Sequence, residues 1–166
     1  MRSRFCVASF NCNGVRSACK KGLVAWLNQR KPDVFALQET KCPPEFLNNT
    51  FGEKYHLAIS THVRNGFAGV SALSVKKPIR VQTFEGGVLQ GRLIEVFFSS
   101  YSLLNIYAPS RSHRSYTEFW REVLDYLEAS PLQNRIWVGD FNQRDQEPPS
   151  ILYKIFMMGW KATDRG

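Results

Sequence analysis

Polar side chains that could bind a metal ion or a phosphate follow an apolar run near residue 140. Asp140 and Asn142 stand two residues apart, at the end of residues 135–139, which we expect to form a buried strand. Three other apolar runs end in a similar way, at Asn11, Glu39 and Tyr107. One such ending is ordinary, whereas four in one short chain predict a built site.

These residue types fit the cleavage of a phosphodiester, which needs charge neutralisation, an activated water and a stabilised leaving oxygen. Glu39 is the best candidate ligand for Mg²⁺, which prefers hard oxygen ligands and keeps several waters; Mn²⁺ is the alternative ion. The Asn11 amide could orient an oxygen bound to that metal. Asp140 could orient or deprotonate the attacking water, while Asn142 and Tyr107 could hydrogen-bond the phosphate.

A basic loop follows Tyr107 and supplies the candidates for substrate binding, Arg111, His113 and Arg114, which could contact phosphates. Structural explanations stay open for every one of these residues. Asn11 could only build a turn, Glu39 could pair with Lys41 on the surface, and the basic loop could simply be solvated. The functional interpretation rests on the combination.

The periodicity predicts the elements that must position these residues. We expect strands over residues 5–10, 34–38, 56–61, 69–74, 79–83, 93–98, 103–107 and 135–139. We expect helices over residues 17–30, 43–49 and 148–158, and one that begins at a capping box formed by Ser115 and Glu118. This order predicts the α/β class, with mixed sheets covered by helices. Ligands in such folds gather at the carboxyl ends of strands, so the four polar endings converge on one edge if these strands run in the same direction.

The chain has 166 residues, a net charge of +8 and an apolar content of 43%. Residues 1–83 carry 13 Lys and Arg against 4 Asp and Glu, whereas residues 84–166 carry 9 against 10. A basic half favours a polyanionic partner, most of all DNA, with RNA as an alternative. No apolar run is long enough to span a bilayer and no signal peptide is visible, so we expect an intracellular protein, cytoplasmic or nuclear, without membrane association.

Two segments together resemble a known family. The segments at residues 37–41 (Leu-Gln-Glu-Thr-Lys) and 139–142 (Gly-Asp-Phe-Asn) are similar to those of the endonuclease/exonuclease/phosphatase superfamily, near exonuclease III and the apurinic endonucleases. Residues 9–16, 69–74, 91–94 and 104–109 extend the resemblance in the same order. It implies a four-layer αββα sandwich, like that of DNase I, and a Mg²⁺-dependent nuclease acting on DNA. It also implies Glu39 and Asn11 at the metal, and Tyr107, Asp140 and Asn142 at the phosphate and its nucleophile.

The chain departs from this family at its end, because relatives close with a Ser-Asp-His segment and none of His56, His62 and His113 has that context. We therefore expect residues 1–166 to be one domain that lacks the C-terminal part of the fold. We expect it to supply mainly one of the two sheets, to expose a large apolar face that favours self-association, and to show little nuclease turnover alone. The alternatives are a catalytically inactive member that binds nucleic acid or protein, and a phosphatase or phospholipase of the same superfamily.

Overall fold

Two four-stranded sheets form the centre of the part of the chain that the structure describes. The structure is a computed structural model and describes residues 5–62, 64, 66–131 and 134–142. The first sheet has the order β1-β2-β4-β3 and the second the order β5-β6-β7-β8. The strands are β1 (Val7–Asn11), β2 (Val34–Gln38), β3 (His56–Ser60), β4 (Val70–Ser74), β5 (Arg80–Gln82), β6 (Leu93–Phe97), β7 (Ser102–Tyr107) and β8 (Arg135–Asp140).

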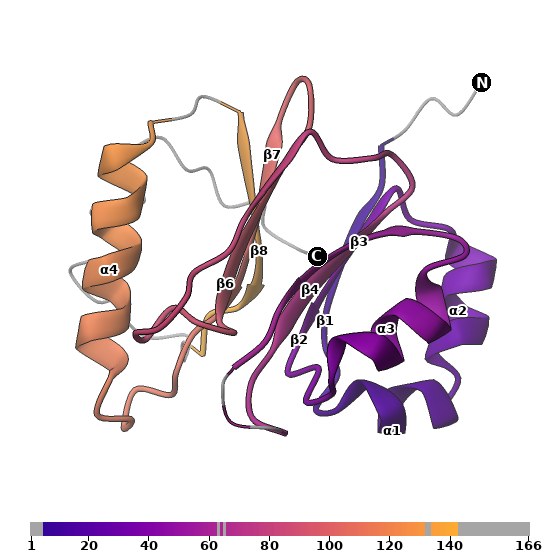
Figure 1. Ribbon diagram of the computed structural model, residues 1–166, viewed down its shortest axis with the longest axis horizontal. Coiled ribbons are helices and arrows are strands. Elements are labelled where there is room, and N and C mark those ends of the chain that lie inside the picture. The colour runs from indigo at the N-terminus through magenta and orange to yellow at the C-terminus, as the bar shows by residue number, and fades with distance from the viewer. Residues whose placement is uncertain (1–4, 63, 65, 132–133, 143–166) are drawn as a thin grey trace, which may run out of the picture.

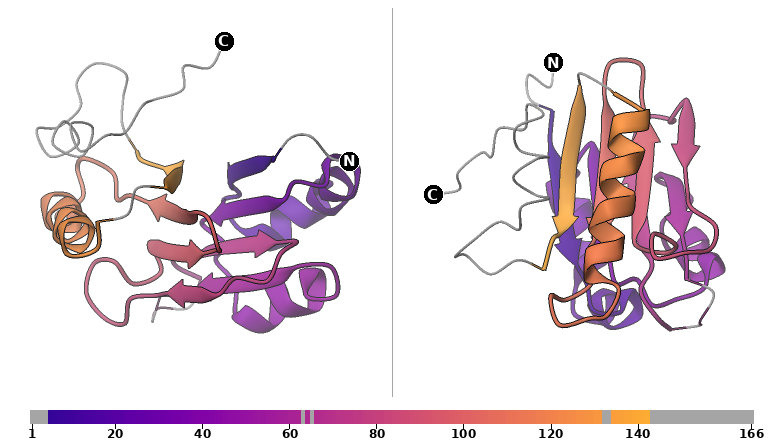
Figure 2. Two further views of the ribbon diagram at one scale, coloured as in Figure 1. Left: turned by 90° about the horizontal axis from the view of Figure 1, so that it is seen from above. Right: turned by 90° about the vertical axis from the view of Figure 1, so that its left-hand side faces the viewer.

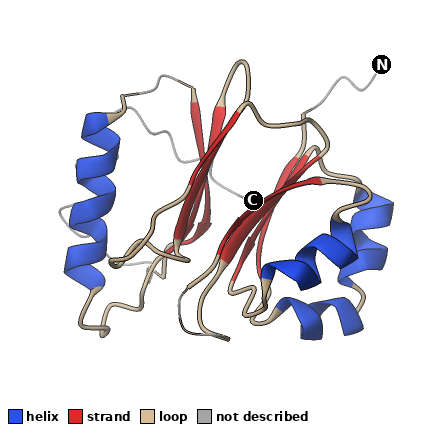
Figure 3. Ribbon diagram, in the orientation of Figure 1, coloured by secondary structure: helices blue, strands red, loops and turns tan. Residues whose placement is uncertain are grey.

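Helices cover the outer face of each sheet, which gives four layers (Figures 1 and 3). The first sheet is covered by α1 (Val15–Lys20), α2 (Leu23–Arg30) and α3 (Pro44–Phe51), and the second by α4 (Tyr116–Ala129). The inner faces of the two sheets pack against each other. The predicted α/β class and αββα sandwich are therefore confirmed. No helix in the described residues combines the length and the apolar character that crossing a bilayer requires.

The alternation of side chains along a strand explains how each sheet is buried on two sides. On β2, Phe35 and Leu37 pack with the helices, whereas Val34 and Ala36 pack against the opposite sheet. A strand that is covered on both faces reads as a continuous apolar run, and every residue of β2 is buried. The same alternation places Asn11, Tyr107 and Asp140 on the inner side of their strands, with Val7 and Val138. Glu39 follows β2 at a position that alternation would direct to the helix side, and its φ of 54° departs from strand geometry.

The expectation that the chain supplies mainly one sheet with a large exposed apolar face is wrong. Both sheets are present, and their inner faces bury each other. Large apolar side chains that stay exposed near β1 are Phe5 (51%), Phe10 (45%) and Trp26 (40%). A groove of about 730 Å³ lies beside them, lined by residues of β1, α1 and α2. Self-association stays a prediction.

Two local predictions about helices are also wrong. The single helix expected over residues 17–30 is two helices, because Gly22 takes a φ of 103° between α1 and α2, a conformation that glycine adopts easily. Ser115 occupies the N-cap of α4 as expected, but its side chain makes no capping hydrogen bond. Its Oγ pairs with His113 Nδ1 at 2.8 Å instead. The helix predicted over residues 148–158 lies outside the described residues.

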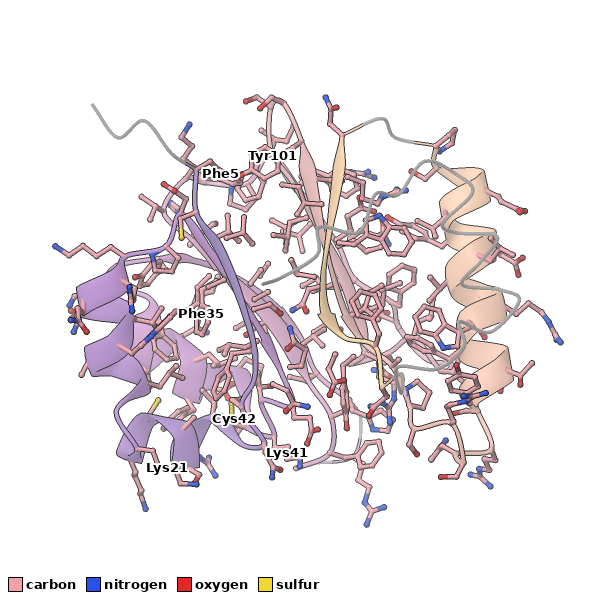
Figure 4. All side chains as sticks on the ribbon, turned by 180° about the vertical axis from the view of Figure 1, so that it is seen from behind. Phe5, Lys21, Phe35, Lys41, Cys42 and Tyr101 are labelled. Carbon is pink, nitrogen blue, oxygen red and sulfur yellow. The ribbon has the colours of Figure 1, made fainter. Side chains whose placement is uncertain are left out.

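Strand direction places the polar endings at one end of the sandwich. β1 and β2 are parallel, as are β7 and β8. Across the sandwich, β1 lies opposite β8, and β2 opposite β7 (Figure 2). Aromatic rings close the far end, where Phe5 contacts Tyr101 with ring centroids 4.9 Å apart. Lys41 marks the other end, where the polar residues gather (Figure 4).

Candidate active site

Asn11 connects two carboxylates that lie far apart in the sequence. Its Nδ2 donates to Glu39 Oε1 at 2.7 Å and to Asp140 Oδ2 at 2.7 Å. The three residues stand at the ends of β1, β2 and β8, so the first sheet supplies two of them and the second sheet supplies the third. The sequence predicted this convergence, and the structure brings the side chains into contact. Their roles as metal ligands and catalytic groups stay predictions.

Glu39 is held by several partners besides Asn11. Lys41 Nζ lies 2.6 Å from Glu39 Oε2 and donates at 2.6 Å to Asn13 Oδ1. Burial alone would raise the pKa of Glu39, but hydrogen bonds from Lys41, Asn11 and Tyr107 and the charge of Lys41 hold it below its usual value. Glu39 is therefore ionised at neutral pH. The ion pair between Glu39 and Lys41, which the sequence offered as a structural alternative, does form, and it lies inside the candidate site.

The backbone around Glu39 is held in the left-handed region. Glu39 has a φ of 54° and Lys41 a φ of 49°, although neither is glycine. Backbone hydrogen bonds from Thr40 N to Gly69 O (3.1 Å) and from Lys41 N to Ala68 O (3.0 Å) fix this segment against the loop before β4. Strain of this kind persists only where the surroundings impose it, and it is concentrated at functional sites.

Tyr107 lies beside a buried arginine that the sequence analysis did not assign to the site. The Arg92 guanidinium is 4.8 Å from the Tyr107 ring centroid, and its Nη1 donates to Tyr107 O at 3.3 Å. Arg92 is only 7% exposed and directly precedes the apolar run of β6, and that position alone does not identify it as a site residue. Burial, together with the neighbouring Glu39, raises the pKa of Tyr107. Tyr107 is therefore a phenol at neutral pH and can donate a hydrogen bond.

Asn142 ties the end of β8 to the end of β7. Its backbone N–H donates to Asp140 Oδ1 at 3.0 Å, which fixes the direction of that carboxylate. Its side-chain Nδ2 donates to Ala108 O at 2.6 Å. The amide group that we predict to contact phosphate is thus bonded to the backbone here, with a second N–H left on the same nitrogen.

The predicted substrate-binding residues Arg111, His113 and Arg114 lie on an exposed loop that follows Tyr107. His113 bonds within the loop, to Ser115. Among the described residues, no hydrogen bond joins these three side chains to Glu39 or Asp140. Their contact with phosphate stays a prediction.

The donor set fits a Mg²⁺ or Mn²⁺ ion that keeps several waters. Within the described ranges, no group of three or more His, Cys, Asp and Glu side chains is arranged to hold a metal. Glu39 and Asn11 offer oxygen atoms, with the Asp140 carboxylate bonded to the same Asn11 amide. Mg²⁺ typically binds one or two carboxylates and substrate phosphates rather than a closed protein cage.

Replacing Gly139 with alanine is expected to displace β8 and Asp140. Gly139 has a φ of +136°, and a Cβ atom there would lie 1.9 Å from Ile106 O on the neighbouring strand. We expect a loss of about 2–4 kcal/mol in the free energy of unfolding, since both the backbone strain and the clash must be relieved. Urea denaturation measures it. Gly86→Ala is the control, because Gly86 has a φ of +73° with nothing within 4 Å, so it adds strain without a clash. Equal losses in the two variants would contradict the prediction.

Replacing Lys41 with methionine is expected to strengthen Mn²⁺ binding about two- to fivefold at pH 7.5, because an ion pair worth up to about 1 kcal/mol no longer competes for Glu39. Without Lys41, the pKa of Glu39 rises, so binding should be lost at a higher pH on acidification than in the wild type. Electron paramagnetic resonance of free Mn²⁺ measures both effects. Lys20→Met removes an exposed charge on α1 and should change neither. Weaker binding by Lys41→Met at pH 7.5 would refute the competition.

The chain is similar in sequence to known nucleases. Residues 8–156 match the model of the Endonuclease/Exonuclease/phosphatase family. A DNA-(apurinic or apyrimidinic site) endonuclease of Dictyostelium discoideum is 28% identical over 151 residues, covering 82% of this chain and 41% of the relative. DNA repair nuclease APEX1 of Danio rerio is 29% identical over 159 residues, covering 85% and 50%. The chain thus spans about half the length of these curated relatives.

Solved structures show the same fold. An AP endonuclease from Archaeoglobus fulgidus superposes with a TM-score of 0.71 at 26% identity, covering 84% of this chain and 58% of that one. A 3'-5' exonuclease from Neisseria meningitidis gives a TM-score of 0.68 at 19% identity, covering 82% and 57%, and at that identity supports the fold alone. With the family model matching most of its length, the chain belongs to the Endonuclease/Exonuclease/phosphatase family.

Proposed function

We propose that this protein is a divalent-metal-dependent phosphodiesterase that hydrolyses DNA. The observation that carries the proposal is the Asn11 amide, which joins the carboxylates of Glu39 and Asp140 at 2.7 Å each. A cluster of oxygen ligands and a phenol, placed between two sheets at their strand ends, is a suitable environment for phosphoryl chemistry. The endonuclease and repair-nuclease relatives support the same reaction class.

Each residue of the cluster has a role that its position allows. Glu39 and Asn11 would hold Mg²⁺ or Mn²⁺, which would supply positive charge against the phosphate oxygens. Asp140, fixed by the Asn142 backbone N–H, orients the attacking water and accepts its proton. Tyr107, kept protonated, donates to a nonbridging phosphate oxygen. The second N–H of Asn142 Nδ2 contacts the scissile phosphate.

DNA is the proposed substrate because the charge and the relatives agree on it. The net charge of +8 favours a polyanion, and Arg111, His113 and Arg114 extend from the site on an exposed loop. A relative described as an apurinic or apyrimidinic endonuclease makes an abasic duplex the first substrate to test. RNA is the second. An intracellular location, cytoplasmic or nuclear, and the absence of membrane association also stay predictions.

We also propose that residues 1–166 alone turn over slowly. None of the three histidines stands in a Ser-Asp-His segment, and among the described residues no hydrogen bond joins an imidazole to Asp140 to assist proton transfer. General acid-base catalysis typically contributes about 10²–10⁴-fold to rate. The one-domain boundary at residues 1–166 is likewise a proposal.

Single-turnover cleavage tests the function. The chain is mixed in excess with a labelled abasic duplex, an intact duplex and an RNA of the same sequence, with Mg²⁺ or with EDTA. We expect slow strand cleavage of DNA that requires Mg²⁺ and falls about 10³-fold in Asp140→Asn. Cleavage that persists in EDTA or in Asp140→Asn would overturn the proposal.

A protein that binds nucleic acid without cleaving it is the second candidate function. One observation favours it: Lys41 lies on Glu39 and neutralises the carboxylate that the metal would need. If the protein only binds, fluorescence anisotropy with the same labelled duplexes should show DNA binding that weakens with salt. In the cleavage assay, neither Mg²⁺ nor the Lys41→Met substitution should then produce cleavage.

A further inference from the structure

A pair of buried amide side chains crosses the otherwise apolar contact between the two sheets. Gln38 on β2 is 1% exposed and Asn105 on β7 is 0% exposed. The surrounding contact is made of aliphatic side chains, including Val70, Ile94 and Leu103. Burying amides in such a place costs free energy unless their hydrogen bonds are made, so the pair requires an explanation.

The hydrogen bonds of this pair run from one sheet to the other. Asn105 Nδ2 donates to the carbonyl oxygens of Leu37 and Ser71, both at 3.0 Å, and these residues face each other on β2 and β4. Gln38 Nε2 donates to Asn105 Oδ1 at 2.7 Å and to Ser9 Oγ at 3.1 Å on β1. One side chain from the second sheet is therefore bonded to two strands of the first, and its partner Gln38 reaches a third.

Hydrogen bonds between the two sheets restrict the position of one sheet relative to the other more than apolar packing does. Apolar contact is non-directional, so aliphatic side chains alone specify the relative position of two sheets less sharply than hydrogen bonds do. A hydrogen bond weakens steeply when its angle or distance changes. Asn105 takes part in three such bonds, two as donor and one as acceptor, and they oppose sliding of the second sheet along β2 and β4.

The same pair lies next to the candidate site on both sheets. Gln38 directly precedes Glu39, and Asn105 lies two residues before Tyr107, on the same face of β7. Glu39 and Tyr107 interact across the sheets, and Asn11 donates a hydrogen bond to Asp140 across them. Catalytic groups must be held within about 0.5 Å of their working geometry, so relative movement of the sheets would separate both pairs.

We propose that Gln38 and Asn105 are positioning residues, which fix the two sheets relative to each other and so hold Glu39 against Tyr107 and Asn11 against Asp140. The consequence for cleavage rests on the proposed function, but the positioning itself does not. Gln38 acts through the residue that follows it and Asn105 through the residue two places along the same strand.

Two readouts test the proposal in the 166-residue chain. The first is the ¹³Cζ resonance of Tyr107 in tyrosine-labelled protein, assigned by its loss in Tyr107→Phe and recorded below the unfolding temperature of each variant. The second is the affinity for Mn²⁺. Gln38→Met and Asn105→Leu should each move the resonance and weaken Mn²⁺ binding about tenfold, at the lower end of what loss of a residue that supports a metal ligand typically costs. The double variant should lose no more Mn²⁺ affinity than Asn105→Leu does, because both substitutions break the same hydrogen-bond network between the sheets.

Leu104→Ala is the matched control, because Leu104 is equally buried on β7 but packs on the α4 side. It should lose stability without moving the Tyr107 resonance or the Mn²⁺ affinity. Gln38→Met retains the two bonds from Asn105 to the backbone, so it decides the question if Asn105→Leu does not fold. A Tyr107 resonance unchanged in Gln38→Met, or moved as far by Leu104→Ala, would overturn the proposal. If the wild type binds no Mn²⁺, the metal proposal fails, while the resonance still decides on positioning.

Discussion

Glu39→Gln is expected to weaken Mn²⁺ binding by about 100-fold, equivalent to about 2.7 kcal/mol. The substitution keeps the shape of the side chain and removes the charge of the predicted metal ligand. An amide is a much poorer ligand for a hard cation than a carboxylate is. Its –NH₂ group would also face the Asn11 Nδ2 donor, now 2.7 Å from Glu39 Oε1, unless the amide rotates. Isothermal titration with Mn²⁺ measures the loss, and Mg²⁺-dependent cleavage should fall with it.

Glu45→Gln provides the matched control for this prediction. Glu45 lies on the first turn of α3 and is exposed, and its substitution by glutamine changes the net charge by the same amount as Glu39→Gln does. If the effect of Glu39→Gln came from the general charge of the protein, both variants would weaken binding equally. Equal affinities of Glu39→Gln and the wild type would exclude Glu39 as a metal ligand.

The place of the site residues within each sheet could be predicted from sequence because it depends on strand pattern and direction. β2 is a continuous apolar run followed by Glu39, and β8 ends at Asp140. Two parallel pairs, β1 with β2 and β7 with β8, follow from a helical segment between the strands of each pair. Polar residues at the carboxyl ends of each pair therefore lie at the same edge of their sheet, whereas the contact of Asn11 with Asp140 also depends on how the two sheets pack.

The partners of the buried polar residues could not be predicted in this way. Arg92 directly precedes β6, Gln38 ends β2 and Asn105 interrupts the apolar run of β7, and a local pattern does not indicate what they contact. Their partners are 15, 68 and 67 positions away in the sequence. The relative position of two sheets depends on such contacts, which only the folded chain reveals.

The break at Gly22 was missed for a different reason. Leu23 and Leu27 continue the spacing of Cys19, so the apolar stripe runs through the glycine as though one helix were present. A glycine inside a helix costs only about 1 kcal/mol, so its presence alone does not predict a break. The expectation of mainly one sheet follows from the resemblance and not from the strand pattern.

A buried ion pair under α4 carries the second large prediction. Glu95 on β6 has a fully buried side chain, and Arg135 on β8 is 7% exposed. Arg135 Nε donates to Glu95 Oε1 at 2.8 Å and its Nη2 to Oε2 at 3.2 Å. Ser102 and Tyr126 also donate to this carboxylate. The network lies on the outer face of the second sheet, so it joins β6, β7 and β8 without touching the candidate site.

Arg135→Met is therefore expected to destabilise the protein by about 3–5 kcal/mol, lowering the unfolding temperature by about 10 °C, because it leaves the Glu95 carboxylate buried without its counter-charge. Replacing both charged residues by methionine removes the uncompensated charge, so the double variant should recover most of the loss. Arg121→Met, on the exposed face of α4, should cost less than about 0.5 kcal/mol. Differential scanning calorimetry measures all three. If the double variant were no more stable than Arg135→Met, the loss would come from packing of the arginine side chain instead of its charge.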